Sequence, residues 1–435
     1  MNVAVMKTKA EQALSEAFEK AASQLPGTTA VKVLRADAIG QFSALGLPHR
    51  RIEEWKYTDL RALIKDVASS AAPRDPAAVA ASYKSVLKSV ATDTYVFVDG
   101  KLASAPKDKT ATGVTVEALA AALASGPAAL IFDAPLTLDA GAKSVVALNA
   151  AFVSDGAVIH IADGAKPERP LHLIFIASGA VAVRNTIAVG AGAHATIIET
   201  HVAAGREARN ENAMTMITLD DGATLHHAVI TEAAQGTVFL GNTIAHLGAN
   251  AIYKPFQLTS GQGLVRHQMT VTFAGQHADF DLSAAALANA GGHFDTTLVV
   301  DHAVPHCTSR ELFKCVLDGR ARGIFQGKVI VRPDAQKTDG KQMAQALMLS
   351  PDAEFDSKPE LEIYADDVVC GHGTTTMELD KDLMFYCMSR GIPETEARAL
   401  LIESFVGEVI DRIENEDLRA AMLMYAMSWL NTARG

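Results

Sequence analysis

The sequence has few of the features that mark membrane proteins, secreted proteins or nucleic-acid binders. No run of about eighteen uncharged apolar residues occurs, so a membrane-spanning helix is not expected. The N-terminal stretch MNVAVMKTKAEQALSEAFEK becomes charged at once and lacks the apolar centre of a signal peptide. The formal net charge is -11, whereas a nucleic-acid-binding domain is usually basic. These absences predict a cytoplasmic protein that binds neither membrane nor nucleic acid.

Cysteine is also scarce. The chain has four cysteines, all in its last third and none in a C-x-x-C pair: Cys307, Cys315, Cys370 and Cys387. That usage fits a reduced compartment and provides neither a disulfide framework nor a zinc finger.

Sequence patterns for nucleotide binding and for hydrolysis are missing as well. Residues 190–195, GAGAHA, fit G-x-G-x-x-A, but no helix follows to receive a pyrophosphate at its N-terminus. Around Lys328 the match to a Walker loop fails, because Arg322 stands at the first glycine and Val329 at the Ser/Thr position. Neither a G-x-S-x-G elbow nor an H-E-x-x-H pair occurs. We therefore do not expect this chain to be an ATPase or an enzyme of those classes.

Short β-type runs separated by glycine-bearing turns fill the chain from about 145 to 375. Runs such as LHLIFIASG and GKVIVRPD follow one another too closely for intervening helices, which excludes a sheet of βαβ units. Turn glycines recur about every 26 to 30 residues, a spacing typical of stacked solenoid coils: Gly192, Gly222, Gly248 and Gly275. An irregular parallel β-helix is our first prediction, and a β-sandwich or jelly roll is the second.

Helical patterns flank the β-rich region on both sides. Apolar residues repeat at helical spacing between about 7 and 65, and again near the C-terminus. There, Gly391 predicts the end of one helix and Pro393 the start of the next. We expect three parts: an N-terminal helical region (1–92), a β-helix core (93–375) and a C-terminal helical domain (376–435).

Histidines recur through the predicted coils, about 20 to 26 residues apart, at His201, His226, His246, His267 and His293. On one face of a solenoid they would form a ladder of imidazoles able to bind iron or zinc. Solvated or hydrogen-bonded histidines on polar strand faces are the favoured interpretation. A β-helix lyase or acyltransferase that uses His267, His302 or His306 as a base is a further alternative.

The segment KPELEIYADDVVCGHGTTT, residues 358–376, contains the clearest candidate site. Its first half alternates apolar and acidic residues, which predicts a half-buried strand. Cys370 and His372 lie two apart, so on an extended backbone both side chains point the same way and can reach one iron or zinc ion. Two ligands are too few for a closed site, so others would come from elsewhere, another chain included. A glycine-rich turn with a buried thiol is the alternative.

Three segments of the chain carry a resemblance to a known family. They are LPHRRIEEWKYTDLR (47–61), the run from RELFKC to TDGKQ (310–342), and the run from KPELEIY to EVIDRI (358–413). Together they resemble the SufB/SufD family of iron–sulfur cluster assembly proteins. The first segment, the modest length and the few cysteines resemble its SufD branch. His372 corresponds to the histidine of the family's C-S-H-G motif, and Gly371 replaces the serine.

The resemblance implies a right-handed parallel β-helix between helical regions, in a scaffold without enzymatic activity. It implies pairing with a SufB-type subunit through the β-helix cores and binding of a SufC-type ABC ATPase by the C-terminal helices. It also implies a transient iron–sulfur cluster shared with the SufB-type subunit, with His372 and Cys370 as candidate ligands and no cofactor held tightly by this chain alone. A SufB-like paralogue remains an alternative, as does a homodimer of the isolated chain.

Overall fold

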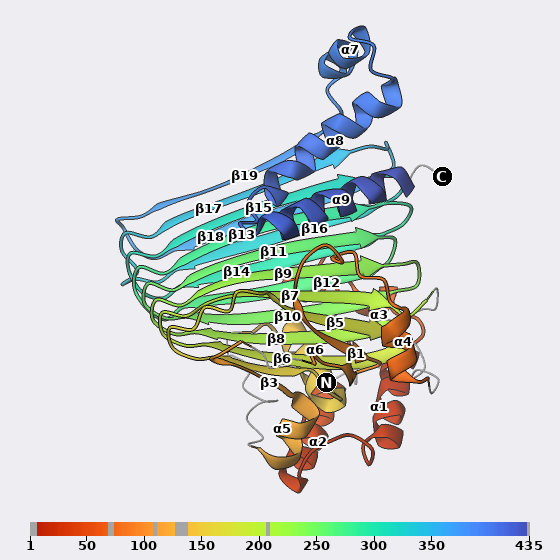
Figure 1. Ribbon diagram of the computed structural model, residues 1–435, viewed down its shortest axis with the longest axis vertical. Coiled ribbons are helices and arrows are strands. Elements are labelled where there is room, and N and C mark those ends of the chain that lie inside the picture. The colour runs from red at the N-terminus through yellow and green to blue at the C-terminus, as the bar shows by residue number, and fades with distance from the viewer. Residues whose placement is uncertain (1–6, 68–73, 108–110, 127–137, 206–208, 433–435) are drawn as a thin grey trace, which may run out of the picture.

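The centre of the molecule is a two-sided stack of strands (Figure 1). The computed structural model describes residues 7–67, 74–107, 111–126, 138–205 and 209–432. Within these residues, sheet A consists in spatial order of β2 (Lys101–Ser104), β1 (Asp93–Val98), β5 (Leu171–Ala177), β7 (His194–Ala203), β9 (Thr224–Ala233), β11 (Ile252–Gly261), β13 (Asp279–Ala288), β15 (Thr308–Leu317), β17 (Asp339–Met348) and β19 (Val369–Met377). Sheet B consists of β3 (Val114–Ala118), β4 (Ala157–Ile161), β6 (Ala180–Val189), β8 (Asn210–Leu219), β10 (Val238–Leu247), β12 (Leu264–Phe273), β14 (His293–His302), β16 (Arg322–Val331) and β18 (Glu354–Ile363).

The pairing pattern is that of a parallel β-helix. From β4 onward the chain alternates between the sheets, and each strand pairs in parallel with the strand two positions later, as β10 does with β12 and β11 with β13. Antiparallel pairs occur at the N-terminal end, between β1 and β2 and between β3 and β4. The β-helix predicted from the turn spacing is confirmed, and the sandwich and jelly-roll alternatives are wrong.

The interior of the stack explains the many small apolar residues. Alternate side chains of each strand point between the sheets, as Phe280, Leu282, Ala284 and Ala286 of β13 do. Facing sheets lie about 10 Å apart, which leaves room for alanine opposite larger side chains. The left-handed backbone conformation recurs in turns between coils, at Gly192, Gly222, Asn250, His277, His306 and Lys337.

Several helical segments of the described residues precede or interrupt the early strands: α1 (Lys9–Ala21), α2 (Thr29–Leu45), the 3-10 turn η1 (Glu53–Trp55), α3 (Leu60–Leu63), α4 (Pro76–Ser82), α5 (Leu119–Ser125) and α6 (Ala140–Phe152). α6 packs against α2 and against β6 and β8 of sheet B. α5 and α6 lie inside the range 93–375 that we expected to be the β-helix core. α6 shows little amphipathic pattern because most of its residues are buried. No helix in the described parts of the chain is long and apolar enough to cross a membrane.

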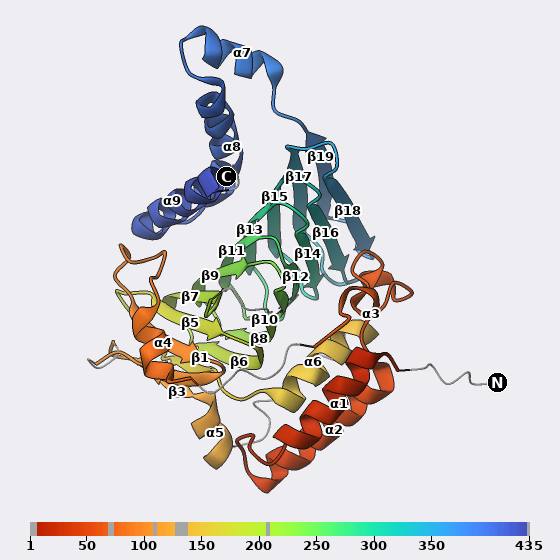
Figure 2. The same cartoon turned by 90° about the vertical axis from the view of Figure 1, so that its right-hand side faces the viewer.

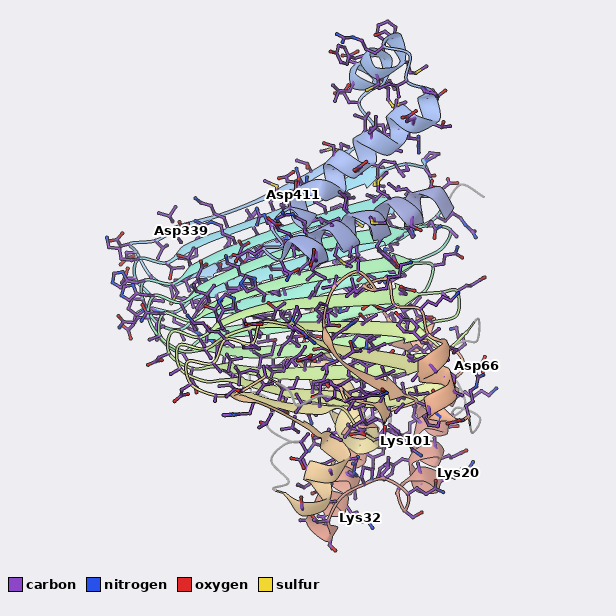
Figure 3. All side chains as sticks on the ribbon, in the orientation of Figure 1. Lys20, Lys32, Asp66, Lys101, Asp339 and Asp411 are labelled. Atoms are coloured by element: carbon purple, nitrogen blue, oxygen red, sulfur yellow. The ribbon has the colours of Figure 1, made fainter. Side chains whose placement is uncertain are left out.

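Three helices follow the stack: α7 (Lys381–Ser389), α8 (Glu394–Ile410) and α9 (Glu416–Thr432). Gly391 has a φ of 85° and follows the end of α7, and α8 starts directly after Pro393, as predicted. α8 and α9 cover the outer face of sheet A through an apolar cluster that includes Leu258, Leu312 and Val406. α7 lies beyond them, away from the strands (Figures 1 and 2). Asp411, labelled in Figure 3, caps the C-terminus of α8 over this sheet.

Candidate functional site

β19 and β18 are the last strands of their sheets, so they form one open end of the β-helix. β19 pairs with β17 on one side, and among the described residues no strand pairs with its other edge. α1 and α2 lie towards the opposite end of the stack (Figure 2), whereas η1 reaches β18 through an ion pair between Glu53 and Lys358. An exposed strand edge presents unpaired N–H and C=O groups, which makes it a template for a strand of another chain.

His372 lies on β19 and is exposed to solvent. Cys370, two residues earlier on the same side of the strand, is half-buried and packs against the interior apolar cluster. Burial raises the pKa of the Cys370 thiol, and the nearby Asp339 and Glu311 carboxylates raise it further. The imidazole is therefore accessible to another molecule, while the thiol is protonated at neutral pH and faces inward.

The segment around His372 is a strand, and whether His372 and Cys370 bind a metal stays a prediction. Cys370 to Met377 form a regular strand and not a glycine-rich turn, so the turn alternative is wrong. Neither Gly371 nor Gly373 has a positive φ angle, so neither adopts the left-handed backbone conformation. At Gly373 a Cβ atom would lie 2.7 Å from the Cε of Met343 on β17, so close packing explains that glycine.

The described residues do not by themselves form a complete metal site around Cys370 and His372. In the described residues no group of three His, Cys, Asp or Glu side chains is placed to hold one ion. A two-ligand site open to solvent needs ligands from outside to hold iron. That a second molecule completes the ligands of Cys370 and His372 stays a prediction.

Two buried polar side chains below His372 were missed from the sequence. Gln342 on β17 pairs in register with His372, and Glu311 on β15 pairs in register with Gln342. Each is 3% exposed, and neither side chain has a hydrogen-bond partner for its terminal atoms. Burial raises the pKa of Glu311 to about 8, although the nearby Ser309 hydroxyl and the Arg310 charge lower it. The spacing of about one coil between Glu311, Gln342 and His372 is the sequence signal that could have found them, but no motif identifies these positions.

A second group of buried charges lies in the middle of the stack. Glu199 accepts hydrogen bonds from Thr215 and Asn185 and contacts His227 at 2.9 Å. His201 Nδ1 lies 2.6 Å from Glu211, which also accepts a hydrogen bond of 2.6 Å from Arg209. Because each charge has an opposite partner, this network is a structural part of the interior.

The histidine ladder does not form. His201 pairs in register with Thr231 and not with His226, and His246 pairs with Thr272. The pairing registers place residues about 26 to 32 apart, so histidines 20 to 26 apart fall on different positions or different sheets. The alternative of hydrogen-bonded and solvated histidines describes them better.

The three histidines named for the β-helix enzyme alternative lie apart from one another in the described residues. Burial lowers the pKa of His267 to about 3 and that of His302 to about 4, and both rings are in the interior. His306 is exposed in a turn, and its ring stacks on the His277 ring with the two ring centroids 4.9 Å apart. None of the four best-formed cavities in the described residues is lined by two of these three histidines.

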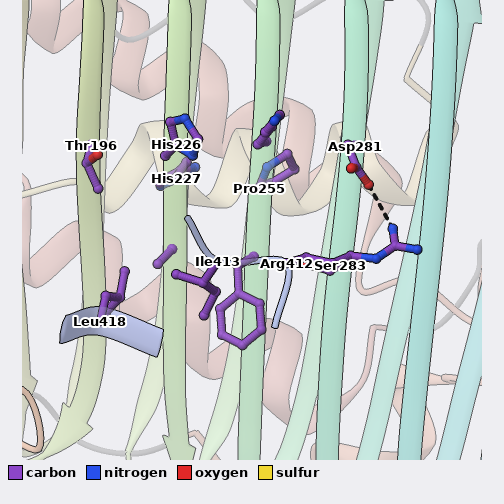
Figure 4. A pocket seen from close by; sticks show the side chains of 12 residues that line it. Thr196, His226, His227, Pro255, Asp281, Ser283, Arg412, Ile413 and Leu418 are labelled. Carbon is purple, nitrogen blue, oxygen red and sulfur yellow. Dashed lines mark hydrogen bonds and ion pairs between the residues drawn. The ribbon is translucent and has the colours of Figure 1, made fainter. Parts of the chain in front are cut away.

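A small open cavity of about 50 Å³ lies where the segment between α8 and α9 crosses sheet A (Figure 4). Its charged groups are already paired: Arg412 with Asp281 at 2.9 Å, and Lys254 with Glu414 at 2.5 Å. His226 lies 3.5 Å from the same Glu414 carboxylate. The residues around this cavity attach the C-terminal helices to sheet A of the β-helix.

Comparisons with known proteins match the whole architecture. The family model described as "SUF system FeS cluster assembly, SufBD core domain" matches residues 174–405, and the "SufBD protein N-terminal region" matches residues 8–173. The iron–sulfur cluster assembly protein SufD of Escherichia coli is 30% identical over 397 residues, which cover 88% of this chain and 89% of that protein. A SufBD family protein of Synechocystis is 29% identical, covering 89% of this chain and 88% of the relative. A chloroplastic Arabidopsis thaliana protein is 29% identical over 62% of this chain and 60% of its own length.

The two family-model matches together run from residue 8 to residue 405, so they include the N-terminal helices, the strands, α7 and most of α8. Together with the parallel β-helix and its flanking helices, these matches establish that the chain belongs to the SufBD family of iron–sulfur cluster assembly proteins and is similar to SufD.

Proposed function

We propose that this chain is a non-catalytic scaffold subunit for building iron–sulfur clusters, and that it acts with a SufB-type subunit and a SufC-type ABC ATPase. The observation that carries the proposal is the position of His372: an exposed imidazole on the terminal strand of the β-helix, beside an unpaired strand edge. The SufB-type subunit binds at this end, and the nascent cluster is a transient cargo at the seam between the two subunits. The compartment proposed is the cytoplasm, where thiols such as the four free cysteines stay reduced.

His372 is the proposed ligand from this side of the seam, and Cys370 is the second candidate. A neutral imidazole binds iron through one ring nitrogen, while a thiolate from the partner binds the same cluster. A site shared by two chains opens when they separate, which suits a cluster that must be passed on. The exposure of His372 leaves its ring accessible to the partner's ligands.

The C-terminal helices are the proposed binding site for the ATPase. α7 exposes large apolar side chains away from the stack, with Phe385 73% exposed and Tyr386 54% exposed. Isolated apolar side chains are normal on a surface, but several on one short helix mark a binding surface. A phosphate loop is missing from this chain, so hydrolysis has to come from the partner.

Replacing His372 with alanine tests the proposal. The variant chain is combined anaerobically with the SufB-type and SufC-type subunits, iron, a sulfide source and ATP, and the iron and acid-labile sulfide in the purified complex are measured. Thr376→Ala is the matched control, because Thr376 is exposed on the same side of β19. We expect His372→Ala to fold and assemble normally but to hold much less iron and sulfide than Thr376→Ala. Equal contents in the two variants would contradict the role of His372.

A further inference from the structure

Directly below His372, the interior of the β-helix contains a column of polar side chains with no assigned role. His372, Gln342 and Glu311 occupy paired positions on β19, β17 and β15. Paired residues on neighbouring strands lie about 4.8 Å apart, and all three side chains point into the interior between the sheets. Neighbours on this face are apolar, such as Ala344 and Phe313. A polar column in an apolar interior is therefore a distinct feature of this end of the stack.

The lower two members have their hydrogen-bonding groups buried and unused. The Oε1 and Nε2 atoms of Gln342 have no hydrogen-bond partner, and neither have the two carboxylate oxygens of Glu311. The neighbouring Ser309 hydroxyl lies 3.2 Å from His302 Nε2, and it also lowers the pKa of the Glu311 carboxyl. Buried polar groups are nearly always hydrogen-bonded in folded proteins, so four unpaired atoms in adjacent side chains call for an explanation. The nearest groups in register are each other and the His372 ring.

The space around Gln342 is suited to a movement of its amide. Gly327 of β16 faces it from sheet B, where a Cβ atom would lie 2.8 Å from Gln342 Oε1. A side chain at position 327 would fill this space. The last torsion of a glutamine side chain has broad energy wells, so the amide group can rotate at little cost.

We propose that Gln342 and Glu311 are positioning residues for His372, and this inference rests on the proposed role of His372 as a cluster ligand. One ring nitrogen of His372 donates its hydrogen to Gln342 Oε1, and Gln342 Nε2–H donates to a Glu311 oxygen. The other ring nitrogen of His372 is then deprotonated and points out of the open end, ready to bind iron. Histidine ligands usually donate their second ring N–H to such a partner, which fixes the tautomer and the direction of the ring.

The column gives the exposed ring an orientation that its own strand does not provide. Ladders of amide side chains between stacked strands are a known way to hold such groups in register. Either protonation state of Glu311 has an oxygen that accepts from Gln342, so the arrangement does not depend on the charge of Glu311.

The test uses the full chain, labelled with ¹⁵N-histidine and assembled with unlabelled SufB-type and SufC-type subunits. Gln342→Met removes the amide and keeps an unbranched side chain of similar length. Gln257→Met is the matched control, because Gln257 is also 3% exposed with an unpaired Oε1, but lies on β11, away from the open end. The measurements are iron and sulfide content and the ¹⁵N coupling to the reduced cluster in pulsed EPR.

We expect Gln342→Met to lower the retained iron and sulfide about 10-fold or more, and to weaken the ¹⁵N coupling, as loss of a group that orients a metal ligand does. Gln257→Met should behave like the wild type. The double variant Glu311→Gln/Gln342→Glu exchanges the two groups and keeps an acceptor below the ring, so it should restore both measurements. Should Gln342→Met fail to fold, Glu311→Met removes the far acceptor and is expected to show the same loss.

The outcomes separate this inference from the proposed function. If Gln342→Met matches Gln257→Met while His372→Ala is defective, the ligand role stands and the positioning role is wrong. An exchange variant as defective as Gln342→Met would also overturn the positioning role. If His372→Ala itself retains wild-type iron and sulfide, both proposals fall.

Discussion

Replacing His201 with phenylalanine tests the buried charge network at the centre of the stack. The His201 ring stacks on Phe175 with ring centroids 4.9 Å apart and contacts Phe239 edge-on at 4.9 Å. A phenyl ring therefore fits the space, and the main loss is the positive charge between Glu211 and Glu199. Breaking a buried ion pair by removing one partner typically costs about 3–5 kcal/mol.

The pH dependence of the free energy of unfolding gives a second estimate of what the protonated His201 ring contributes. Burial alone would lower the pKa of His201, but the carboxylates of Glu211 and Glu199 raise it to about 9. Relative to the ordinary value near 6.5, this shift corresponds to about 3 kcal/mol of stabilisation by the protonated ring. Because the folded-state pKa is raised, this contribution is fully present below pH 6.5 and is lost as the pH rises through 9.

Urea unfolding followed by circular dichroism measures the difference between wild type and His201→Phe. We expect the destabilisation to be largest near pH 6 and to shrink by roughly 3 kcal/mol by about pH 9.5. The raised pKa of Glu311 affects both proteins equally and cancels in the difference. A difference in unfolding free energy that stays constant over this range would refute the assignment of a protonated His201.

Three further predictions concern the surroundings of the stack. Trp55→Ala should lower the free energy of unfolding by about 3–5 kcal/mol, measured by urea unfolding. The Trp55 side chain is 1% exposed, and the Arg266 guanidinium lies 3.8 Å from the centroid of its ring. An unchanged unfolding midpoint would contradict this prediction. Iodoacetamide should modify Cys387 on α7 before Cys315, as followed by mass spectrometry. Cys315 is fully buried, and burial raises the pKa of its thiol well above the usual value. Early labelling of Cys315 would contradict its placement in a packed interior. Phe385→Asp should weaken binding of the SufC-type ATPase at least tenfold, measured by calorimetry, because losing an exposed aromatic anchor costs about 2 kcal/mol of binding free energy. Met424→Asp, on the equally exposed surface of α9, should leave the affinity unchanged. Equal affinities of the two variants would remove α7 from the interface.

The strand pattern predicted the fold well because it depends on local rules. Alternation fixes which residues of a run face the interior, and the glycine spacing gives the coil length. Gly192 and Gly222 lie in left-handed turns, as expected of residues that tolerate that backbone. α6 was missed because its residues are buried on nearly all sides, so the sequence has no polar face to reveal a helical period.

Contacts between coils could be predicted only in part. His372 and Cys370 were identified by a local spacing and by the family motif, and their placement on one strand follows from it. The column of Glu311, Gln342 and His372 depends on register over successive coils of unequal length. An error of one residue in a coil would turn a side chain to the opposite face. For the same reason the sequence could not show which histidines align between coils: His201 pairs with Thr231 and not with His226.

The domain boundaries at 92 and 375 remain predictions, although the helices after β19 begin at Lys381, close to the second boundary. The N-terminal boundary is less distinct in the structure, because α5 and α6 come after the first strand of sheet A. These two helices interrupt the strands before the regular alternation of the coils starts at β4. The first coils and the N-terminal helices therefore share one packed region.

The most direct measurement of the central claim is amide hydrogen exchange of this chain alone and after mixing with its SufB-type partner. If the open end of the β-helix is the seam, the amides of β19 from Val369 to Met377 should become strongly protected, because their free edge pairs with or is covered by the partner. Strands in the middle of the stack, such as β9, should be unchanged. Protection confined to other surfaces, with β19 exchanging as fast as in the isolated chain, would contradict the account.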